Sequence, residues 1–434
     1  MVTAAAPPAG ERGGRTIWRG SPRPAPSKDA AYVKILGLDD ALERYATAWR
    51  ALEEARPAAT VFQGVGWART YAAWQRQRDH VADGRHARAP GQRLGRGQAT
   101  DAPFVLIAHA DDDTVTGIWP LQSERHVGCR FAVALSEPFA QYADILIAEH
   151  VDDEAIVFAL LEALRSLGQY SGLLLRKVRQ DAICRPFIAA DAVVVGEERA
   201  PAVDVRGYAT FADYHATITT KTRKNLRNAR NRLKRDGAPV VHAVVDAPDA
   251  VAVAARRALD LRARFLQARG DTSRAFLNGA FAGFVDALVG GVADADLPDA
   301  DGVKLIAFEL RRGEDTLSMQ WGFVHGGRYY AYIAARNEAF DAQSPGRLHL
   351  EDVVRAGFDL GVSHVDFLAP AMDYKMTWAN EAPNVRDYGM AFSRAGQVAL
   401  LLAFGRPRQW AKSLFRALPL GARRMALRML TRPT

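Results

Sequence analysis

Cysteine is nearly absent from this chain, which has only Cys129 and Cys184 among 434 residues. Two cysteines exclude a disulfide framework, and no spacing typical of a metal site accompanies them. The sequence therefore favours a reducing compartment and a chemistry that uses no metal. We interpret both cysteines as small buried apolar residues.

Long apolar runs are missing as well. The N-terminal residues are rich in Ala, Pro, Gly and Arg and contain no apolar core of signal-peptide length. The apolar run from Val398 to Phe404 is far too short to span a bilayer. We therefore expect a cytoplasmic protein, with residues 1–30 as a disordered leader because they contain five prolines and little apolar surface.

Acidic residues are absent from the C-terminal end. Residues 405–434 contain eight Lys or Arg and no Asp or Glu, and without these eight the 57 basic residues of the chain become 49, equal to its 49 acidic residues. Apolar side chains such as Trp410, Leu414 and Phe415 lie among these charges. We expect residues 401–434 to form a basic, amphipathic, helical tail, which either contacts the inner face of an anionic membrane or packs on the protein body.

The remaining chain has the length of two or three domains, at roughly 100–200 residues each. Its apolar pattern predicts a hairpin, a helix and a strand, and this order occurs twice. The first set is 104–108, 115–121, 153–167 and 172–175, and the second is 303–310, 317–324, 345–360 and 363–368. Further strands are expected at 32–36, 328–334 and 385–393, helices at 38–55 and 65–75, and a surface loop at 76–101. The pattern predicts an α/β fold with mixed sheets.

A strongly basic helix is predicted at residues 221–235, where eight of fifteen residues are Lys or Arg and none is acidic. Thr222, Leu226, Ala229 and Leu233 form one narrow apolar stripe at helical spacing. The other faces could bind an anion such as a phosphate, an acidic sugar or RNA. The alternative is a solvated helix between the two halves of the chain.

A turn formed by Ser344, Pro345, Gly346 and Arg347 directly precedes the helix at 345–360. The free N–H groups at a helix start, together with the helix dipole, favour bound anions. Gly346 would let a phosphate approach the backbone, and Arg347 could pair with it. An ordinary helix cap with Ser344 as the capping residue is the alternative.

Two polar clusters lie among apolar residues. Asp366 falls within a predicted buried strand, where a carboxylate needs either partners or a task, and Tyr374 and Lys375 follow shortly after it. This group predicts either a buried ion pair or an acid/base site. Tyr142 and Asp144 form a similar pair in the first half, which could recognise an acceptor or form a turn. We interpret His325 and His349 as structural or surface residues.

The order of these motifs resembles a known group of proteins. The basic helix with Lys221, Arg223, Asn225 and Leu226 comes first, followed by a hairpin and a Tyr-rich strand, then Asn337, Ser344-Pro345-Gly346, Gly361, Asp366-Phe367, Tyr374-Lys375 and Trp378. Over roughly residues 30–400 the chain resembles the GNAT-type acetyltransferases of the CelD-like or BioF2-like family. It is more distantly similar to the Fem aminoacyltransferases of peptidoglycan synthesis.

The resemblance implies two GNAT-like halves with mixed sheets, at residues 31–205 and 206–400, that face each other across a cleft. It implies that acyl-CoA is the co-substrate and binds at the turn from Ser344 to Leu348, through Ser344, Gly346, Arg347 and Leu348, and beside Tyr332 on the central strand. Of the glycines that are usual in this turn of GNAT proteins, only Gly346 is present here.

The reaction that the resemblance implies is direct transfer of an acyl group from acyl-CoA to an amine on a sugar or cell-envelope precursor. Asp366 is the first candidate for the base, with Lys375 and Tyr374 orienting the reactants or neutralising charge. Tyr142, Asp144, Lys221, Arg223, Asn337 and Trp378 are candidates for substrate binding. The alternatives are a Fem-like transferase that uses aminoacyl-tRNA and a non-catalytic partner of an envelope polysaccharide synthase.

Overall fold

The computed structural model describes residues 28–56, 58–82, 102–235, 239–269, 275–276, 280–293 and 303–405. Lys28–Ala30 forms a single 3-10 turn, and the rest of the expected leader lies outside the described residues. The same holds for most of the loop expected at 76–101 and for the tail beyond residue 405. No helix in the described part is long and apolar enough to cross a membrane.

The first sheet, as far as the chain is described, has eight strands in the order β1-β2-β3-β4-β6-β14-β7, with β5 paired to β3. The strands are β1 (Tyr32–Gly37), β2 (Phe104–His109), β3 (Val115–His126), β4 (Cys129–Ala134), β5 (Leu146–Ile147), β6 (Gly172–Arg179), β7 (Val193–Arg199) and β14 (Asn384–Ala391). The accompanying helices are α1 (Leu38–Ala55), α2 (Val65–Ala82), α3 (Asp153–Ser166), α4 (Arg185–Asp191) and α11 (Arg394–Phe404).

Strand β2 illustrates why a strand of this sheet is a largely apolar run rather than an alternation of apolar and polar residues. All its residues are buried because both faces of the sheet are covered. Val105 and Ile107 belong to a core that includes residues of α1 and α2, whereas Phe104 and Leu106 belong to a core that includes residues of α3. Helix α2 continues to Ala82, so the start of the expected surface loop at residue 76 is wrong.

The second sheet has six described strands in the order β8-β13-β12-β11-β10-β9. The strands are β8 (Ala202–Asp204), β9 (Val240–Val245), β10 (Lys304–Arg312), β11 (Asp315–His325), β12 (Arg328–Arg336) and β13 (His364–Asp366). The accompanying helices are α5 (Phe211–Thr217), α6 (Thr220–Arg235), α7 (Pro248–Arg269), α8 (Ala280–Ala293), α9 (Pro345–Asp359) and α10 (Asp373–Met376).

Both sheets contain the repeated unit that the sequence predicts. Strands β2, β3 and β4 pair antiparallel, and α3 then carries the chain to β6, which pairs parallel to β4. Strands β10, β11 and β12 pair antiparallel, and α9 carries the chain to β13, which pairs parallel to β12. Parallel neighbours need such a crossover. The prediction of an α/β fold with two mixed sheets is confirmed.

The two sheets exchange strands. Strand β14, late in the sequence, lies between β6 and β7 of the first sheet, and β8 pairs with β13 of the second sheet. The sheets therefore do not divide at residue 205, and the boundary expected there stays a prediction about folding units.

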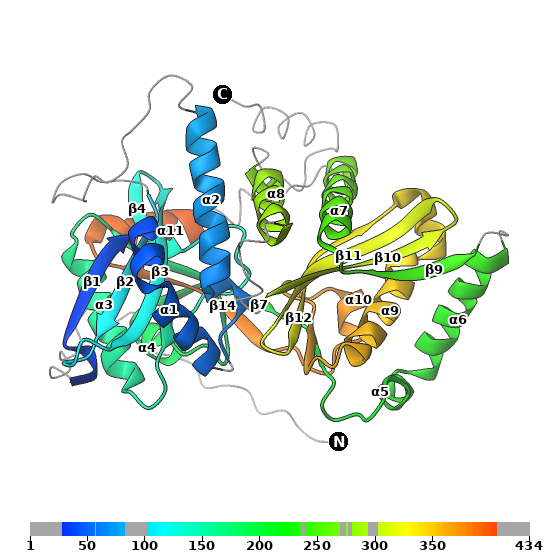
Figure 1. Cartoon of the computed structure of the whole chain (residues 1–434), viewed down its shortest axis with the longest axis horizontal. Helices are drawn as coiled ribbons and strands as arrows, with labels where there is room; N and C mark the ends of the chain where they lie inside the picture. Colours follow the sequence, from blue (N-terminus) through cyan, green and yellow to red (C-terminus); the bar gives the residue numbers. More distant parts are fainter. Residues whose placement is uncertain are drawn as a thin grey trace, which may run out of the picture.

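Helices α2, α8 and α7 stand between the two sheets (Figure 1), and α8 packs against both α2 and α7. Their apolar residues share one core with residues of both sheets. Phe62 and Trp67 from the first half contact Phe323 of β11 at ring-centroid distances of 6.3 and 5.6 Å. The two halves are thus joined by a continuous apolar core.

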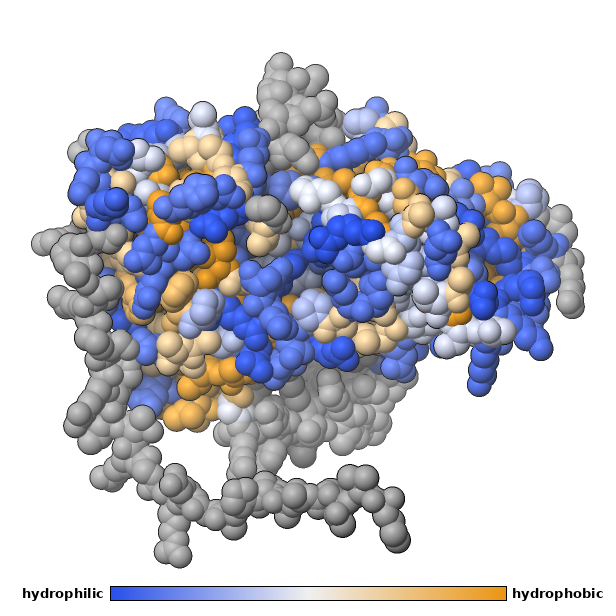
Figure 2. All heavy atoms as spheres, turned by 90° about the horizontal axis from the view of Figure 1, so that it is seen from below, coloured by the Kyte–Doolittle hydropathy of each residue, from blue (hydrophilic) through white to orange (hydrophobic). Residues whose placement is uncertain are grey.

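Helix α6 lies at the outer end of the second half (Figure 1) and confirms the predicted basic helix. Leu226, Ala229 and Leu233 are buried along one edge, against the core that includes α9 residues. Figure 2 shows that this end of the molecule is mostly hydrophilic on the face seen there.

Candidate functional site

The central feature of the second half is the place where β12 and β13 separate. The two strands pair only at Arg328–His364, Tyr329–Val365 and Tyr330–Asp366. Beyond Tyr330, β12 continues to Arg336 beside β11 and has no strand on its other edge among the described residues. We call this opening the β12–β13 cleft.

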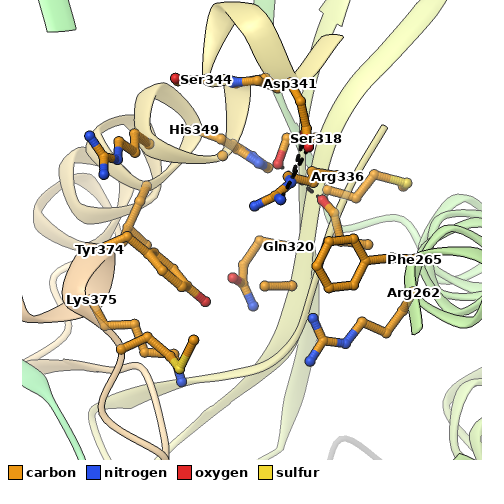
Figure 3. Close-up of a pocket in the computed structure, with 18 of the residues that line it drawn as sticks. Arg262, Phe265, Ser318, Gln320, Arg336, Asp341, Ser344, His349, Tyr374 and Lys375 are labelled. Carbon is orange, nitrogen blue, oxygen red and sulfur yellow. Dashed lines mark hydrogen bonds and ion pairs between the residues drawn. The ribbon is translucent and has the colours of Figure 1, made fainter. Parts of the chain in front are cut away.

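A cavity of about 730 Å³ lies over the cleft, between α7, β11, β12, the start of α9 and α10 (Figure 3). A smaller cavity of about 180 Å³ adjoins it and extends between Ala331–Ala334 of β12 and Phe367–Pro370 after β13. The two cavities share Arg262, Gln320, Ala334, Leu350, Pro370, Tyr374 and Lys375 in their walls. They therefore form one continuous space that reaches from the surface to the edge of β12.

The larger cavity carries a strong positive charge. Four arginines line it, against two carboxylates, Asp341 and Asp373, and the four are Arg262, Arg269, Arg336 and Arg347. Arg336 Nε lies 2.8 Å from Asp341 Oδ1. The Arg269 and Arg336 guanidinium groups lie 4.6 and 4.9 Å from the Phe265 ring centroid. The arrangement suits a ligand with several negative charges.

The start of α9 forms one wall of this cavity, as Figure 3 shows for Ser344. Ser344 has a left-handed backbone conformation, with φ 55°, and its side chain does not cap the helix. Ser344 is thus the N-cap residue, as the alternative expected, but it caps the helix without a side-chain hydrogen bond. A Cβ atom on Gly346 would meet only Arg336 Cδ, at 3.9 Å, so the backbone faces open space here. A helix start with open space before it suits an anionic group.

The predicted turn residues divide into two groups. Ser344, Gly346 and Arg347 line the cavity, whereas the Leu348 side chain is buried in the core of the second half. His349, which we interpreted as structural or surface, lines the cavity and is buried, and burial lowers its pKa well below the usual value. It is therefore neutral at pH 7.

Lys375 and Tyr374 lie where the two cavities meet (Figure 3). Lys375 Nζ donates hydrogen bonds to the carbonyl oxygens of Leu368 and Pro370, at 2.9 and 3.1 Å. Burial lowers the pKa of Lys375 to about 8, against the opposing effect of the Asp366 charge. Burial also raises the pKa of Tyr374, so its hydroxyl keeps its proton.

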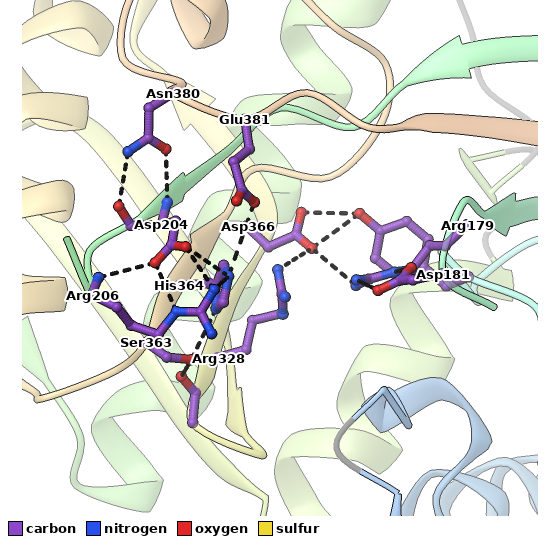
Figure 4. A network of polar contacts seen from close by, with 12 residues as sticks. Arg179, Asp181, Asp204, Arg206, Arg328, Ser363, His364, Asp366, Asn380 and Glu381 are labelled. Carbon is purple, nitrogen blue, oxygen red and sulfur yellow. Dashed lines mark hydrogen bonds and ion pairs between the residues drawn. The ribbon is translucent and has the colours of Figure 1, made fainter. Parts of the chain in front are cut away.

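Asp366 does not line either cavity. Its carboxylate is 2% exposed and accepts hydrogen bonds from the Tyr142 hydroxyl at 3.0 Å and from the Leu368 N–H at 2.8 Å. Arg328 Nη1 and Arg179 Nη1 lie 3.4 and 3.8 Å from Asp366 Oδ2. These partners surround the carboxylate, and the geometry favours the buried ion pair over the acid/base site (Figure 4).

Tyr142 and Asp144 also have protein partners. Tyr142 joins the first half to Asp366, and burial raises its pKa well above the usual value. Asp144 accepts hydrogen bonds from the backbone N–H groups of Ile145, Ile183 and Cys184, at 2.9 to 3.0 Å. Burial raises the pKa of Asp144, although these bonds oppose the shift. Neither residue lines the cavities, so their contacts favour the turn interpretation.

The remaining predicted site residues differ in whether they line a cavity. Tyr332 lines the smaller cavity, and its hydroxyl donates to the Phe139 carbonyl at 2.8 Å. Asn337 caps the 3-10 helix Glu338–Gln343, and Trp378 is buried in the core. Lys221 and Arg223 lie on α6, outside both cavities.

Sequence reasoning missed several wall residues. Arg262, Phe265 and Arg269 come from α7, whose pattern we did not recognise as a helix, and Gln320 comes from the middle of a predicted strand. The i, i+3, i+7 spacing of the α7 residues places them on one helical face and could have indicated a ligand-facing surface.

Comparison with known proteins supports this description of the second half. Residues 220–376 match the family described as the acetyltransferase (GNAT) domain. No curated protein matches the chain.

Three solved structures illustrate the similarity of fold. FemX has 12% identity and a TM-score of 0.49, covering 80% of this chain and 96% of FemX. The C-terminal domain of a lysylphosphatidylglycerol synthetase from Agrobacterium fabrum, itself an uncertain assignment, has 12% identity and a TM-score of 0.44, covering 69% of this chain and 88% of that chain. A tandem GNAT protein from the clavulanic acid biosynthesis pathway has 12% identity and a TM-score of 0.43, covering 83% and 99%.

These TM-scores are below 0.5, so the three structures illustrate the fold alone, and the family match is confined to residues 220–376. The matched residues begin with α6 and end with Met376 of α10, and they include the β12–β13 cleft, the start of α9 and Lys375. Residues 220–376 are therefore similar to an acetyltransferase domain of the GNAT type.

Proposed function

We propose that the protein transfers an acyl group from acyl-CoA to an amine that binds in the β12–β13 cleft. The observation that carries this proposal is the separation of β12 from β13 beside a helix start surrounded by arginines. The arginines and the α9 start suit the phosphates of the co-substrate. The open edge of β12 offers backbone N–H groups to a thioester carbonyl.

In the proposed reaction the amine nitrogen attacks the thioester carbon, the C–N bond forms, the C–S bond breaks, and the thiolate leaves. Holding both reactants in one cleft reduces the entropic part of the barrier. We assign proton acceptance to Lys375 rather than Asp366, because Lys375 faces the cavity and has a pKa of about 8. Tyr374 keeps its proton and, in this proposal, donates a hydrogen bond to the leaving sulfur.

The acceptor class follows from the resemblance to CelD-like or BioF2-like proteins. It is an amine on a sugar or on a cell-envelope precursor, and the CelD-like assignment is part of the proposal. The net positive charge of the larger cavity supports the co-substrate and does not distinguish among acceptors.

Calorimetric titration with acetyl-CoA and longer acyl-CoAs tests the proposal. We expect micromolar binding to the wild type and loss of binding in Gly346→Trp, because the indole would fill the space before α9. Gly207→Trp is the matched control, since a Cβ atom there meets nothing within 4 Å and Gly207 lies outside both cavities. Equal affinity in all three proteins would contradict the assigned site.

Failure to bind any acyl-CoA would reject the leading proposal and favour one of two others. Salt-sensitive binding of aminoacyl-tRNA would indicate a Fem-like transferase, with α6 contacting phosphates. Sedimentation with anionic liposomes that is lost on deletion of residues 405–434 would support peripheral membrane contact and a role beside an envelope polysaccharide synthase.

A further inference from the structure

A second polar cluster lies at the other end of β13, away from the cavities (Figure 4). It contains Asp204 of β8, His364 of β13, and Glu381, which lies between α10 and β14. His364 Nε2 is 3.8 Å from Asp204 Oδ2 and 4.0 Å from Glu381 Oε2. In the described part of the chain, this is the group of three whose ligand atoms all lie within 4.8 Å of one another.

Backbone pairing fixes these three residues in position. Asp204 and His364 are direct partners in the β8–β13 register, and Glu381 forms a bridge with Ala202. Asn380 Oδ1 accepts from the Asp204 N–H and Asn380 Nδ2 donates to the Asp204 carbonyl, both at 2.8 Å. Three separate segments of the chain therefore bring their side chains to one point.

Hydrogen bonding determines which ring nitrogen of His364 carries the proton. The single hydroxyl proton of Ser363 goes to the Gly327 carbonyl at 2.8 Å, so the Ser363 oxygen accepts from His364 Nδ1 at 2.9 Å. Nδ1 is then the protonated nitrogen, and Nε2 directs a lone pair toward the two carboxylates. His364 is buried, with 8% of the residue exposed.

A cation between this lone pair and the two carboxylates would relieve the repulsion among them. The Arg206 guanidinium supplies one in this structure, since Nη2 lies 2.6 Å from Asp204 Oδ2 and 3.5 Å from His364 Nε2. The Arg206 side chain is 64% exposed and can turn into solvent. Arg328, the other nearby cation, is instead paired with Asp366.

We propose that Asp204, His364 and Glu381 form a zinc site in which Zn²⁺ replaces the Arg206 Nη2 group. One imidazole nitrogen and two carboxylates leave a fourth tetrahedral position for water. Zinc bonds of about 2.0–2.1 Å place ligand atoms about 3.3 Å apart. His364 Nε2 lies 3.8 and 4.0 Å from the two carboxylates, and the ligand atoms of all three residues lie at most 4.8 Å apart. Zinc binding must therefore bring them closer together by about 0.5–1.5 Å. Most of this movement would come from the exposed Glu381 side chain. The Ser363 contact to Nδ1 is the outer hydrogen bond that zinc-binding histidines require.

Bound zinc would stabilise the β12–β13 cleft, because it would anchor the segment of the chain that forms one wall of the cleft. Glu381 follows α10, which carries Tyr374 and Lys375, and Asp204 and His364 belong to the sheet that holds the other wall. Zinc would fix both ends of residues 364–381 to the sheet. The sequence alone could not indicate this site, because its three ligands are separated by 160 and 17 positions.

Calorimetric titration of the EDTA-dialysed full-length protein with ZnCl₂, at fixed salt, tests the site. We expect one saturable zinc equivalent that Glu381→Gln and His364→Gln each weaken at least tenfold. Glu381→Gln keeps the test valid if the buried His364 variant fails to fold. Arg206→Ala should bind zinc several-fold more tightly because it removes the competing cation. His150→Gln, at an exposed histidine beside Glu149, is the matched control and should bind as the wild type does.

Two results would overturn the proposal. One is the absence of saturable zinc binding in both the wild type and Arg206→Ala. The other is wild-type affinity in Glu381→Gln, which would place the metal elsewhere on the chain. These results do not depend on acyl-CoA binding, so the zinc site and the proposed function can fail separately.

Discussion

The Lys375 amine has a chemical environment that differs from that of a surface lysine. Burial lowers its pKa to about 8, and two backbone carbonyls accept its hydrogen bonds. If Lys375 accepts the proton of the attacking amine, its neutral form is the active one, and that form increases as pH rises. We therefore expect kcat/KM for acyl transfer to rise tenfold per pH unit below pH 8 and to level off above it.

Lys375→Arg provides the matched variant for that prediction. An arginine stays protonated over the whole range, so we expect activity to fall at least 100-fold and the inflection near pH 8 to disappear. Acyl-CoA affinity should change little, because the positive charge is kept. An unchanged pH profile in the variant would assign the inflection to another group.

Asp366 is predicted to stabilise the fold rather than to accept a proton. Asp366→Asn removes the charge that faces Arg328 and Arg179 in a buried site, and leaving such cations without their partner costs about 3 kcal/mol of unfolding free energy. Chemical denaturation measures this cost. Asp181→Asn is the control, because Asp181 also pairs with Arg179 but is exposed, and its loss should cost less than about 1 kcal/mol.

At the scale of elements, periodicity predicted α1, α3, α6 and α9 and the antiparallel strands well, because each has a clear apolar pattern. Helices α7 and α8 were not recognised, since α7 buries mainly alanines and valine, such as Ala254 and Ala258, which give a weak pattern. Strand β13 is only three residues long. The separation of β12 from β13, which creates the cleft, depends on pairing between distant segments and has no local signal.

The sequence pattern of the basic helix α6 predicted the helix and its buried edge, but not the partners of its charged residues. The buried stripe was predicted, but Arg230 turned out to pair with Glu351 and Asp352 of α9, each at 2.9 Å. Part of its positive charge therefore holds α6 on the second half. Lys221 and Arg223 remain outside both cavities, so their predicted role in substrate binding would require a substrate that extends beyond the cleft.

A charge reversal on α6 tests this view. We expect the double variant Lys221→Glu with Arg223→Glu to bind acyl-CoA as the wild type does, because neither residue lines the cavities. Arg347→Glu, which reverses a charge in the cavity wall, should weaken the same binding at least tenfold. If the α6 variant lost acyl-CoA affinity and Arg347→Glu retained it, the anion site would have to be moved to α6.

At the scale of the whole molecule, the two halves are interdependent. Strand β14 crosses from the second half of the sequence into the first sheet, and Phe62 and Trp67 pack against rings of the second sheet. Glu53 of α1 and His325 of β11 form an ion-pair contact of 3.2 Å across the same junction. The sequence repeat correctly indicated two similar units but could not show that each unit is completed by the other.

This interdependence predicts one cooperative unfolding transition for the whole chain. Phe323→Ala would remove a ring from the shared core and should cost about 3–5 kcal/mol, lowering the midpoint of both halves together. Val398→Ala, on the exposed face of α11, should change stability by no more than about 0.5 kcal/mol. Hydrogen exchange followed by mass spectrometry measures the two midpoints, because peptides from β3 report on the first sheet and peptides from β11 on the second. If Phe323→Ala shifted only the second-sheet signal, the halves would be separate folding units, and the boundary predicted near residue 205 would gain support. Coincident shifts would mean that the cleft forms only when β14 has joined the first sheet, because the segment that carries Lys375 leads directly into that strand.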